Sequence, residues 1–389
     1  MSINIEFSDR LKELPPYLFV EIDAAKRKAR SEGRDVIDLG VGDPDLPTLP
    51  HIIEAMKKAI DDPANHRYAL DAGLPELRQA IADRFQTRFG VGLDPAKEIL
   101  PLLGSKEGLA HLPLGIVNPK DKVLLTDPAY PAYRGSIIFA GGKISTVPLK
   151  EGKGFLPDLK AIEDAKDAKV MIINYPNNPT AATATREFYE GLVAIAKAKE
   201  MVIVSDMAYS EIYYDNEKPL SILEIDGAKD VAIEFHSLSK TYNMTGWRVG
   251  WACGNERLVA ALAKVKSNID SGIFQAVQVA AIAALKTPEV ELDDLRRVYQ
   301  ERRDCLINGL RSIGWKITPP KAAFYIFARL PKGFTDSMET AKTFLDKANI
   351  VMTPGVGFGK AGEGFIRMTL TVPTERLTEA VNRLGRILS

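Results

Sequence analysis

The chain has 389 residues, of which 46% are hydrophobic and 26% are charged, and its 51 basic side chains balance its 51 acidic ones. This length suits two or three domain-sized units, and the composition is that of an ordinary globular protein. A net charge of zero argues against nucleic acid or an acidic membrane surface as a partner. The two cysteines imply no disulfide framework, and no apolar run reaches the ~18 residues of a membrane helix. The N-terminus lacks a signal-peptide pattern, so we expect a cytoplasmic protein.

Taken in chain order, short runs rich in β-branched residues alternate with helical patterns over the first two-thirds of the chain. Strands are predicted at 36–39, 100–103, 123–125, 170–173, 202–205, 231–235 and 249–252. Apolar residues at helical spacing predict helices at 50–60, 74–89, 187–199 and 258–266. Strands that alternate with helices indicate right-handed crossovers and a mainly parallel sheet, and therefore an α/β fold.

The pattern changes after about residue 284. A long charged helix at 291–312 precedes two predicted antiparallel strands at 315–318 and 324–330, and helices at 338–348 and 375–388 follow. The first 45 residues carry no βαβ unit of their own and are expected to join this C-terminal part. We therefore predict a large domain over 46–283 and a smaller α+β domain built from 1–45 and 284–389.

Polar side chains follow four of the predicted strands at the point where each strand ends. Ligands of an open parallel sheet bind beyond the carboxyl ends of its strands, so we expect these side chains to converge. Each alone would be an ordinary cap or surface residue, and only the combination indicates a site. The residues are Ser105 and Lys106, Asn178, Asp206 and Tyr209, and Lys240 and Arg248.

One ligand needs all of these groups. Pyridoxal phosphate carries an aldehyde for a lysine, a ring nitrogen for an acid, a phenolic oxygen for hydrogen-bond donors and a phosphate for cations. Lys240 is the candidate that binds the aldehyde covalently, and Asp206 is the candidate partner of the ring nitrogen. The ring oxygen is assigned to Asn178 and Tyr209. The phosphate is assigned to a planar guanidinium and to the N-terminus of a helix, at Arg248, Ser105 and Lys106.

The same residues stand in motifs that occur in a known order. These motifs are Tyr130-Pro131-Ala132-Tyr133, Asn178-Pro179-Thr180, Asp206-Met207-Ala208-Tyr209, Ser237-Leu238-Ser239-Lys240 with Arg248, and Phe365-Ile366-Arg367. In them the chain resembles the class I/II aminotransferases over nearly its whole length. The resemblance implies the fold-type I architecture, with a mostly parallel seven-stranded sheet in the large domain and a small domain from both termini. It also implies a homodimer with shared active sites.

The resemblance assigns further roles. It implies that Tyr130 stacks on the cofactor ring and that the Ser237 hydroxyl binds the phosphate. Tyr68 would reach the phosphate in the partner subunit's site. Arg367 would hold the substrate α-carboxylate, and Gly42 would let the backbone approach that carboxylate closely.

The chain further resembles the subgroup of this family that acts on LL-diaminopimelate, in two N-terminal stretches, 14–22 and 36–44. This resemblance implies LL-diaminopimelate and 2-oxoglutarate as substrates, with tetrahydrodipicolinate and glutamate as products. It implies that Tyr17 lines the substrate pocket near Lys106. Asp71 and Asn268 would reach the far end of the substrate from the partner subunit. The subgroup carries Glu at the place of Asp71, which is one methylene longer.

We expect a ping-pong transfer in which Lys240 moves a proton at the substrate α-carbon, first as base and then as acid. A broad aspartate, alanine or aromatic aminotransferase is the nearest alternative, and a β-lyase or decarboxylase is a further one. A regulatory protein on this fold would be expected to lose Lys240 or to gain a DNA-binding extension. Residues 357–362 match the G-x-G-x-x-G pattern, but they lack the flanking strand and helix of a dinucleotide site. No metal is expected.

Overall fold

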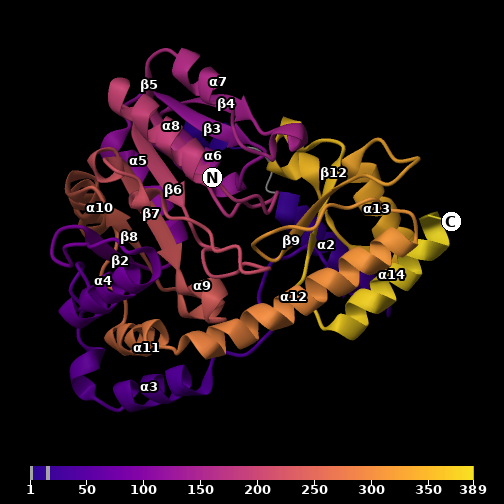
Figure 1. Cartoon of the computed structure of the whole chain (residues 1–389), viewed down its shortest axis with the longest axis horizontal. Coiled ribbons are helices and arrows are strands. Elements are labelled where there is room, and N and C mark those ends of the chain that lie inside the picture. Colours follow the sequence, from indigo (N-terminus) through magenta and orange to yellow (C-terminus); the bar gives the residue numbers. More distant parts are fainter. Residues whose placement is uncertain (1–2, 15–17, 389) are drawn as a thin grey trace.

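The computed structural model describes residues 3–14 and 18–388. Its larger part is built around a seven-stranded sheet covered by helices (Figure 1). The strands lie in the order β2-β8-β7-β6-β5-β3-β4, where β8 is antiparallel to both neighbours and the other neighbouring pairs are parallel. Their bounds are β2 (Ile99–Leu102), β3 (Lys122–Asp127), β4 (Lys143–Pro148), β5 (Ala168–Asn174), β6 (Val202–Asp206), β7 (Ala232–Ser237) and β8 (Gly250–Gly254). The predicted α/β fold with a mostly parallel sheet is confirmed.

Helices cover both faces of this sheet. Successive residues of a strand point to opposite sides, so the residues on both sides of each strand are buried. In β5, Val170 and Ile172 pack on the side of α5, α6 and α10, whereas Met171 and Ile173 pack on the side of α4, α8 and α11. The strands therefore read as continuous apolar runs in the sequence. The helices of this part are α3 (Pro50–Ile60), α4 (Pro75–Phe89), α5 (Ser105–Ile116), α6 (Pro131–Phe139), α7 (Leu159–Asp164), α8 (Arg186–Ala198), α9 (Leu238–Thr241), α10 (Glu256–Ile269) and α11 (Gln275–Leu285).

The smaller part has its own core and two small sheets. A three-stranded antiparallel sheet has the order β11-β12-β9, and β1 pairs in parallel with β10. Tyr299, Phe324, Ile366 and Leu377 are buried together between this sheet and the helices around it. The bounds are β1 (Ile37–Asp38), β9 (Tyr325–Arg329), β10 (Ile350–Val351), β11 (Thr353–Pro354), β12 (Phe365–Thr369), α1 (Asp9–Lys12), α2 (Leu18–Ser31), α12 (Glu289–Ser312), α13 (Ser337–Ala348) and α14 (Thr374–Leu388).

The segment that follows β1 runs from the smaller part to the larger one. The carbonyl of Leu39 accepts a hydrogen bond from the Thr369 N–H at 2.9 Å. Three residues further on, the Gly42 carbonyl accepts one from the Lys240 ammonium at 3.0 Å. The segment thus brings the N-terminal residues to the rim of the large sheet.

The predicted elements differ from the observed ones in a few places. Residues 315–318 form no strand, although their aromatic and β-branched residues favour one. Trp315 packs on Phe344 instead, its indole N–H donates to the Arg329 carbonyl, and Pro319 and Pro320 then supply no N–H for a ladder. Strands β4, β10 and β11 and helices α1, α2, α6, α7, α9 and α11 are present without having been predicted.

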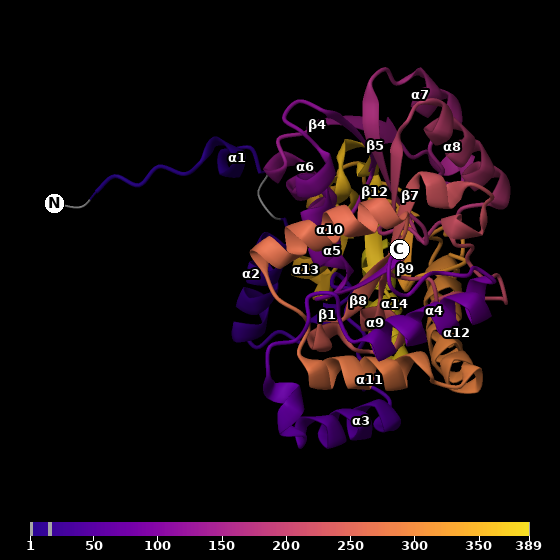
Figure 2. The same cartoon turned by 90° about the vertical axis from the view of Figure 1, so that its left-hand side faces the viewer.

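The two termini and the ends of the larger part are visible in a second view. Figure 2 shows residues 3–8 leading away from the rest of the molecule, and α3 and α11 lying side by side at one end. The domain boundaries at 45–46 and 283–284 stay predictions, and the second falls inside α11. Among the described residues, no helix combines the length and the apolar character needed to span a membrane.

Candidate active site

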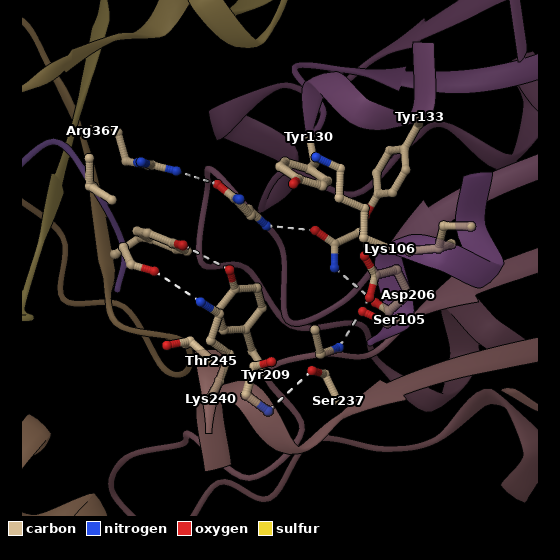
Figure 3. A pocket seen from close by; sticks show the side chains of 18 of the residues that line it. Ser105, Lys106, Tyr130, Tyr133, Asp206, Tyr209, Ser237, Lys240, Thr245 and Arg367 are labelled. Carbon is tan, nitrogen blue, oxygen red and sulfur yellow. Dashed lines mark hydrogen bonds between the residues drawn. The ribbon is translucent and has the colours of Figure 1, made fainter. Parts of the chain in front are cut away.

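A cavity of about 410 Å³ lies beyond the carboxyl ends of the parallel strands, where the smaller part meets the large sheet. Figure 3 shows the side chains of Lys240, Asp206 and Arg367 around it. A volume of this size is typical of a small-molecule site. The sequence-predicted residues that line it are Gly42, Ser105, Lys106, Tyr130, Asn178, Asp206, Tyr209, Ser237, Lys240, Arg248 and Arg367.

Lys240 lies on the short helix α9, directly after β7. Its ammonium donates to the Gly42 carbonyl at 3.0 Å and lies 5.7 Å from the centre of the Phe324 ring. Burial lowers the pKa of Lys240 to about 8, and the positive charges of Arg248 and Arg367 add to this effect against the opposing charge of Asp43. The amine can therefore lose its proton near neutral pH and act as a nucleophile or a base.

Asp206 ends β6 and is buried beside the cavity. The Tyr133 hydroxyl donates to Asp206 Oδ2 at 2.5 Å, and the Ala208 N–H donates to Oδ1 at 3.2 Å. Burial nevertheless raises the pKa of Asp206 to about 6. Within the described part of the chain Asp206 forms no salt bridge. A buried carboxylate without a cation suits a ligand that brings a positive group.

Arg367 lies on β12 and is also buried. Its guanidinium donates to Asn178 Oδ1 at 2.7 Å and to the Gly40 carbonyl at 2.6 Å. It also stacks on the rings of Tyr325 and Phe358, at 4.3 Å and 4.8 Å from their centres. These contacts hold the planar fork in one orientation at the cavity, where it can bind a carboxylate through two hydrogen bonds.

Two tyrosines and a glycine shape the floor between Lys240 and Arg367. The hydroxyls of Tyr209 and Tyr325 lie 2.8 Å apart in a hydrogen bond. A Cβ atom on Gly42 would lie 2.2 Å from the Tyr325 hydroxyl oxygen. Only glycine therefore fits at this position, and the main chain of residue 42 passes directly over the tyrosine.

The opposite end of the cavity is a cradle for an anion. Helix α5 begins there at Ser105, and its first N–H groups have no acceptors within the helix. Gly104 has φ 83°, and a Cβ atom on it would lie 2.4 Å from Arg248 Nη2. Ser237 borders the same end of the cavity. The positive end of a helix, a guanidinium and a hydroxyl together suit a phosphate.

Three of the predicted site residues that the structure describes do not line this cavity. Tyr68 is 93% exposed, and Asp71 and Asn268 are exposed as well. The Asn268 amide donates to the Lys264 carbonyl of its own helix at 2.7 Å. Tyr17 lies outside the described residues. The substrate and partner roles of these four residues stay predictions.

The cavity also contains residues that the sequence did not single out. Tyr133 is the second tyrosine of the Tyr130 motif. It lies three residues after Tyr130, about one turn into the helix that starts there, and this spacing could have suggested that it also faces the site and contacts Asp206. Asn174 ends β5 in register with Asp206 and donates to its carbonyl at 2.8 Å, so pairing the strand ends could have found it. Tyr325 comes from the smaller part, and no local pattern marks it.

Comparison with known proteins agrees with this geometry. Residues 34–384 match the family described as Aminotransferase class I and II. The chain is 57% identical to an LL-diaminopimelate aminotransferase from Aquifex aeolicus, over 98% of this chain and 99% of that one. It is similar to a substrate-bound BacF structure from Bacillus subtilis, with a TM-score of 0.94 and 36% identity over 100% and 98% of the two chains. An aspartate aminotransferase from Thermotoga maritima gives a TM-score of 0.91 and 31% identity over 98% and 100%.

Fold and site together define an enzyme of the pyridoxal-phosphate-dependent fold-type I class. The residues present fit that cofactor: a buried carboxylate without a cation faces the cavity at Asp206, an amine with a lowered pKa lies at Lys240, and the Arg248 guanidinium lies against Gly104 at the start of α5, where an anion can bind. The chain belongs to the class I and II aminotransferases.

Proposed function

We propose that this aminotransferase takes its amino group from LL-diaminopimelate and passes it to 2-oxoglutarate. The products would be glutamate and a keto acid whose remaining amine closes the ring of tetrahydrodipicolinate with loss of water. The observation that carries this proposal is the 57% identity to an LL-diaminopimelate aminotransferase along 98% of the chain. The alternative is a broad aspartate, alanine or aromatic aminotransferase.

Each of the site residues would have a separate role in the transfer. Bound pyridoxal phosphate supplies an aldehyde that takes up the amino group and a ring that delocalises the electron pair left at the substrate α-carbon. Asp206 would keep the ring nitrogen protonated, and Tyr209 would donate to the ring oxygen. Arg367 would hold the α-carboxylate and thereby turn the α-carbon toward Lys240. Lys240, whose pKa is about 8, would then remove the proton from the α-carbon and return it to the carbon that carries the cofactor aldehyde.

The far end of the substrate would be recognised by the partner subunit. LL-diaminopimelate carries an ammonium and a carboxylate at that end. The exposed Asp71 carboxylate suits the ammonium, and the Asn268 amide suits the carboxylate. A strict dicarboxylate enzyme would place an arginine there, and the sequence around Asn268 has none.

We further propose that the active form is a homodimer. Tyr68 and Leu70 are 93% and 66% exposed, and Ile269 and Phe274 are 54% and 40% exposed. The two segments touch, because a Cβ atom on Gly272 would lie 2.3 Å from the Leu70 carbonyl oxygen. Large apolar side chains gathered on adjoining exposed segments favour burial against another chain.

We also propose that the enzyme works in the cytoplasm. Its two cysteines, Cys253 and Cys305, are both free. Burial raises the pKa of the Cys253 thiol well above its ordinary range. Free cysteines and an absent disulfide framework suit a reducing compartment.

The visible spectrum tests the substrate. The yellow holoenzyme would receive LL-diaminopimelate, glutamate, aspartate, alanine or phenylalanine, each added alone without an acceptor. We expect the yellow absorbance to bleach with LL-diaminopimelate and glutamate and hardly with the other three. Bleaching by aspartate, alanine or phenylalanine, with none by LL-diaminopimelate, would leave the aminotransferase and remove the proposed substrate.

Mixed dimers test whether the sites are shared. Lys240→Ala removes the reacting amine of a site, and Asp71→Ala removes the carboxylate that a protomer would lend to its partner. A dimer of one protomer of each variant would then contain one site with both Lys240 and Asp71 intact. We expect the mixture to turn over LL-diaminopimelate faster than the sum of the two separate variants. An additive rate would show that Asp71 serves no site across the dimer.

A further inference from the structure

Lys266 is a buried lysine that the transfer reaction does not use. Its side chain is 0% exposed, and lysine is seldom fully buried unless its charge is paired. From α10, its ammonium donates to Glu107 Oε1 at 3.0 Å, to Asp270 Oδ1 at 2.6 Å and to the Ser271 carbonyl at 3.0 Å. Three acceptors use all three N–H groups of the ammonium. The charge is therefore fixed in one place.

Glu107 connects this ammonium to the anion cradle. Glu107 lies in the first turn of α5, and its second oxygen, Oε2, accepts the N–H of Leu103 at 2.5 Å. The carbonyl of Leu103 in turn accepts a hydrogen bond from Arg248 Nη2 at 3.3 Å. Leu103 leads directly into Gly104 and Ser105, where the phosphate is expected to bind. The carboxylate of Glu107 thus supports the cradle from behind.

Asp270 and Ser271 connect the same ammonium to the surface. They end α10 and precede Gly272, whose main chain packs against the carbonyl of Leu70. Lys266 therefore forms hydrogen bonds to two separate segments. One contains Glu107, which supports the phosphate cradle, and the other contains Asp270 and Ser271, next to the exposed segment around Tyr68.

The cluster is not a metal site. Glu107, His111 and Asp270 each offer a ligand atom, and these atoms lie within 4.8 Å of one another. His111 Nδ1 is 3.6 Å from the Glu107 carboxylate and 3.9 Å from the Asp270 carboxylate. However, the Lys266 ammonium already contacts both carboxylates, so the chain supplies its own cation at this position.

We propose that Lys266 is a positioning residue for the cofactor phosphate. By fixing Glu107 it holds the backbone of residues 103–105 in the conformation that receives the phosphate. Without the ammonium, the carboxylates of Glu107 and Asp270 would face each other in a buried space, and Glu107 would leave Leu103. This inference depends on the cofactor and is independent of the amino donor.

The test compares cofactor binding with and without the phosphate group. Full-length apoprotein of Lys266→Met would be titrated with pyridoxal phosphate and, separately, with pyridoxal, which can still react with Lys240. We expect the dissociation constant of pyridoxal phosphate to rise about tenfold and that of pyridoxal to stay unchanged. Inorganic phosphate should also compete less well. Lys264→Met, at an exposed position of the same helix, is the matched control and should leave all three constants unchanged.

Two results would overturn the proposal. One is an unchanged affinity for pyridoxal phosphate, and the other is an equal loss for pyridoxal and pyridoxal phosphate, which would indicate a general disturbance of the cavity. Thermal unfolding of the apoproteins shows whether Lys266→Met folds. If Lys266→Met does not fold, the same titrations are made with Glu107→Gln, because the glutamine side chain keeps the shape of Glu107 and one of its acceptor oxygens. The same difference between the two ligands is then expected, with a smaller magnitude.

Discussion

The cavity and the exposed segments at 66–73 and 267–274 differ in how far a single chain completes them. Around the cavity, Asp206 and Arg367 are buried; Asp206 accepts a hydrogen bond from Tyr133 on α6, and Arg367 donates one to Asn178 after the end of β5. In the exposed segments, Tyr68, Asp71 and Asn268 face solvent. The residues proposed for the chemistry common to all amino acids are thus brought together within one chain. In the proposed homodimer, the residues proposed to choose among amino acids would lie on a surface that another chain covers.

The largest effect on activity is expected from the residue proposed to bind the α-carboxylate, which all amino-acid substrates share. Arg367→Ala removes two charge-assisted hydrogen bonds to the α-carboxylate, so kcat/KM should fall about 10³-fold for every amino donor. The protein should remain yellow, because Lys240 and the anion cradle are untouched. Steady-state kinetics with several donors would measure this. Arg329→Ala, on the neighbouring strand and largely exposed, is the control. A colourless variant, or a loss limited to one donor, would show that Arg367 does not bind the group that all donors share.

A somewhat smaller effect is expected on the free energy of unfolding of the apoprotein when Asp206 is replaced. The folded-state pKa of about 6 lies above the ordinary 3.8, so the folded apoprotein binds more protons than the unfolded chain between these values. Asp206 therefore costs stability as the pH rises through this window, by roughly 3 kcal/mol in all. Asp206→Asn should stabilise the apoprotein at pH 7.5 by up to this amount and much less near pH 4, while impairing transfer.

Thermal unfolding of both apoproteins at several pH values measures the effect of Asp206. Asp226→Asn, at an exposed position, is the matched control. A gap between wild type and Asp206→Asn that stays constant with pH would mean that the buried carboxylate does not titrate in this window.

The smallest effect is expected in the exposed segment, and it should be selective. Asp71→Ala should lower kcat/KM for LL-diaminopimelate about tenfold, because one hydrogen bond to a charged group is lost. Glutamate has no ammonium at its far end and should be unaffected. Asp83→Ala, an exposed aspartate on α4, serves as the control. An equal loss for both donors would show that Asp71 acts on every substrate and does not select LL-diaminopimelate.

The sequence predicted which residues meet at the cavity for a physical reason. Strands β5, β6 and β7 are buried on both faces and therefore stand out as apolar runs, and the polar residues at their ends were expected to meet and do meet. Tyr325 was missed because it reaches the cavity from a strand of the smaller part, far along the chain. No local pattern encodes that approach.

Two alanines have a backbone conformation that their sequence does not predict. Ala181 has φ 58°, and Ala323 has φ 55°. A side chain in this left-handed region costs about 1 kcal/mol. The surrounding core of buried residues imposes the conformation that glycine would have adopted more easily.

The segment from Leu39 to Gly42 also has a consequence for how the protein is made. The Gly40 carbonyl that holds Arg367 is separated from it by 327 residues. A ribosome must therefore synthesise nearly the whole chain before Gly40 can meet Arg367, and loops of this length close late. The large sheet can form during synthesis, whereas a substrate-binding pocket can exist only in the released chain.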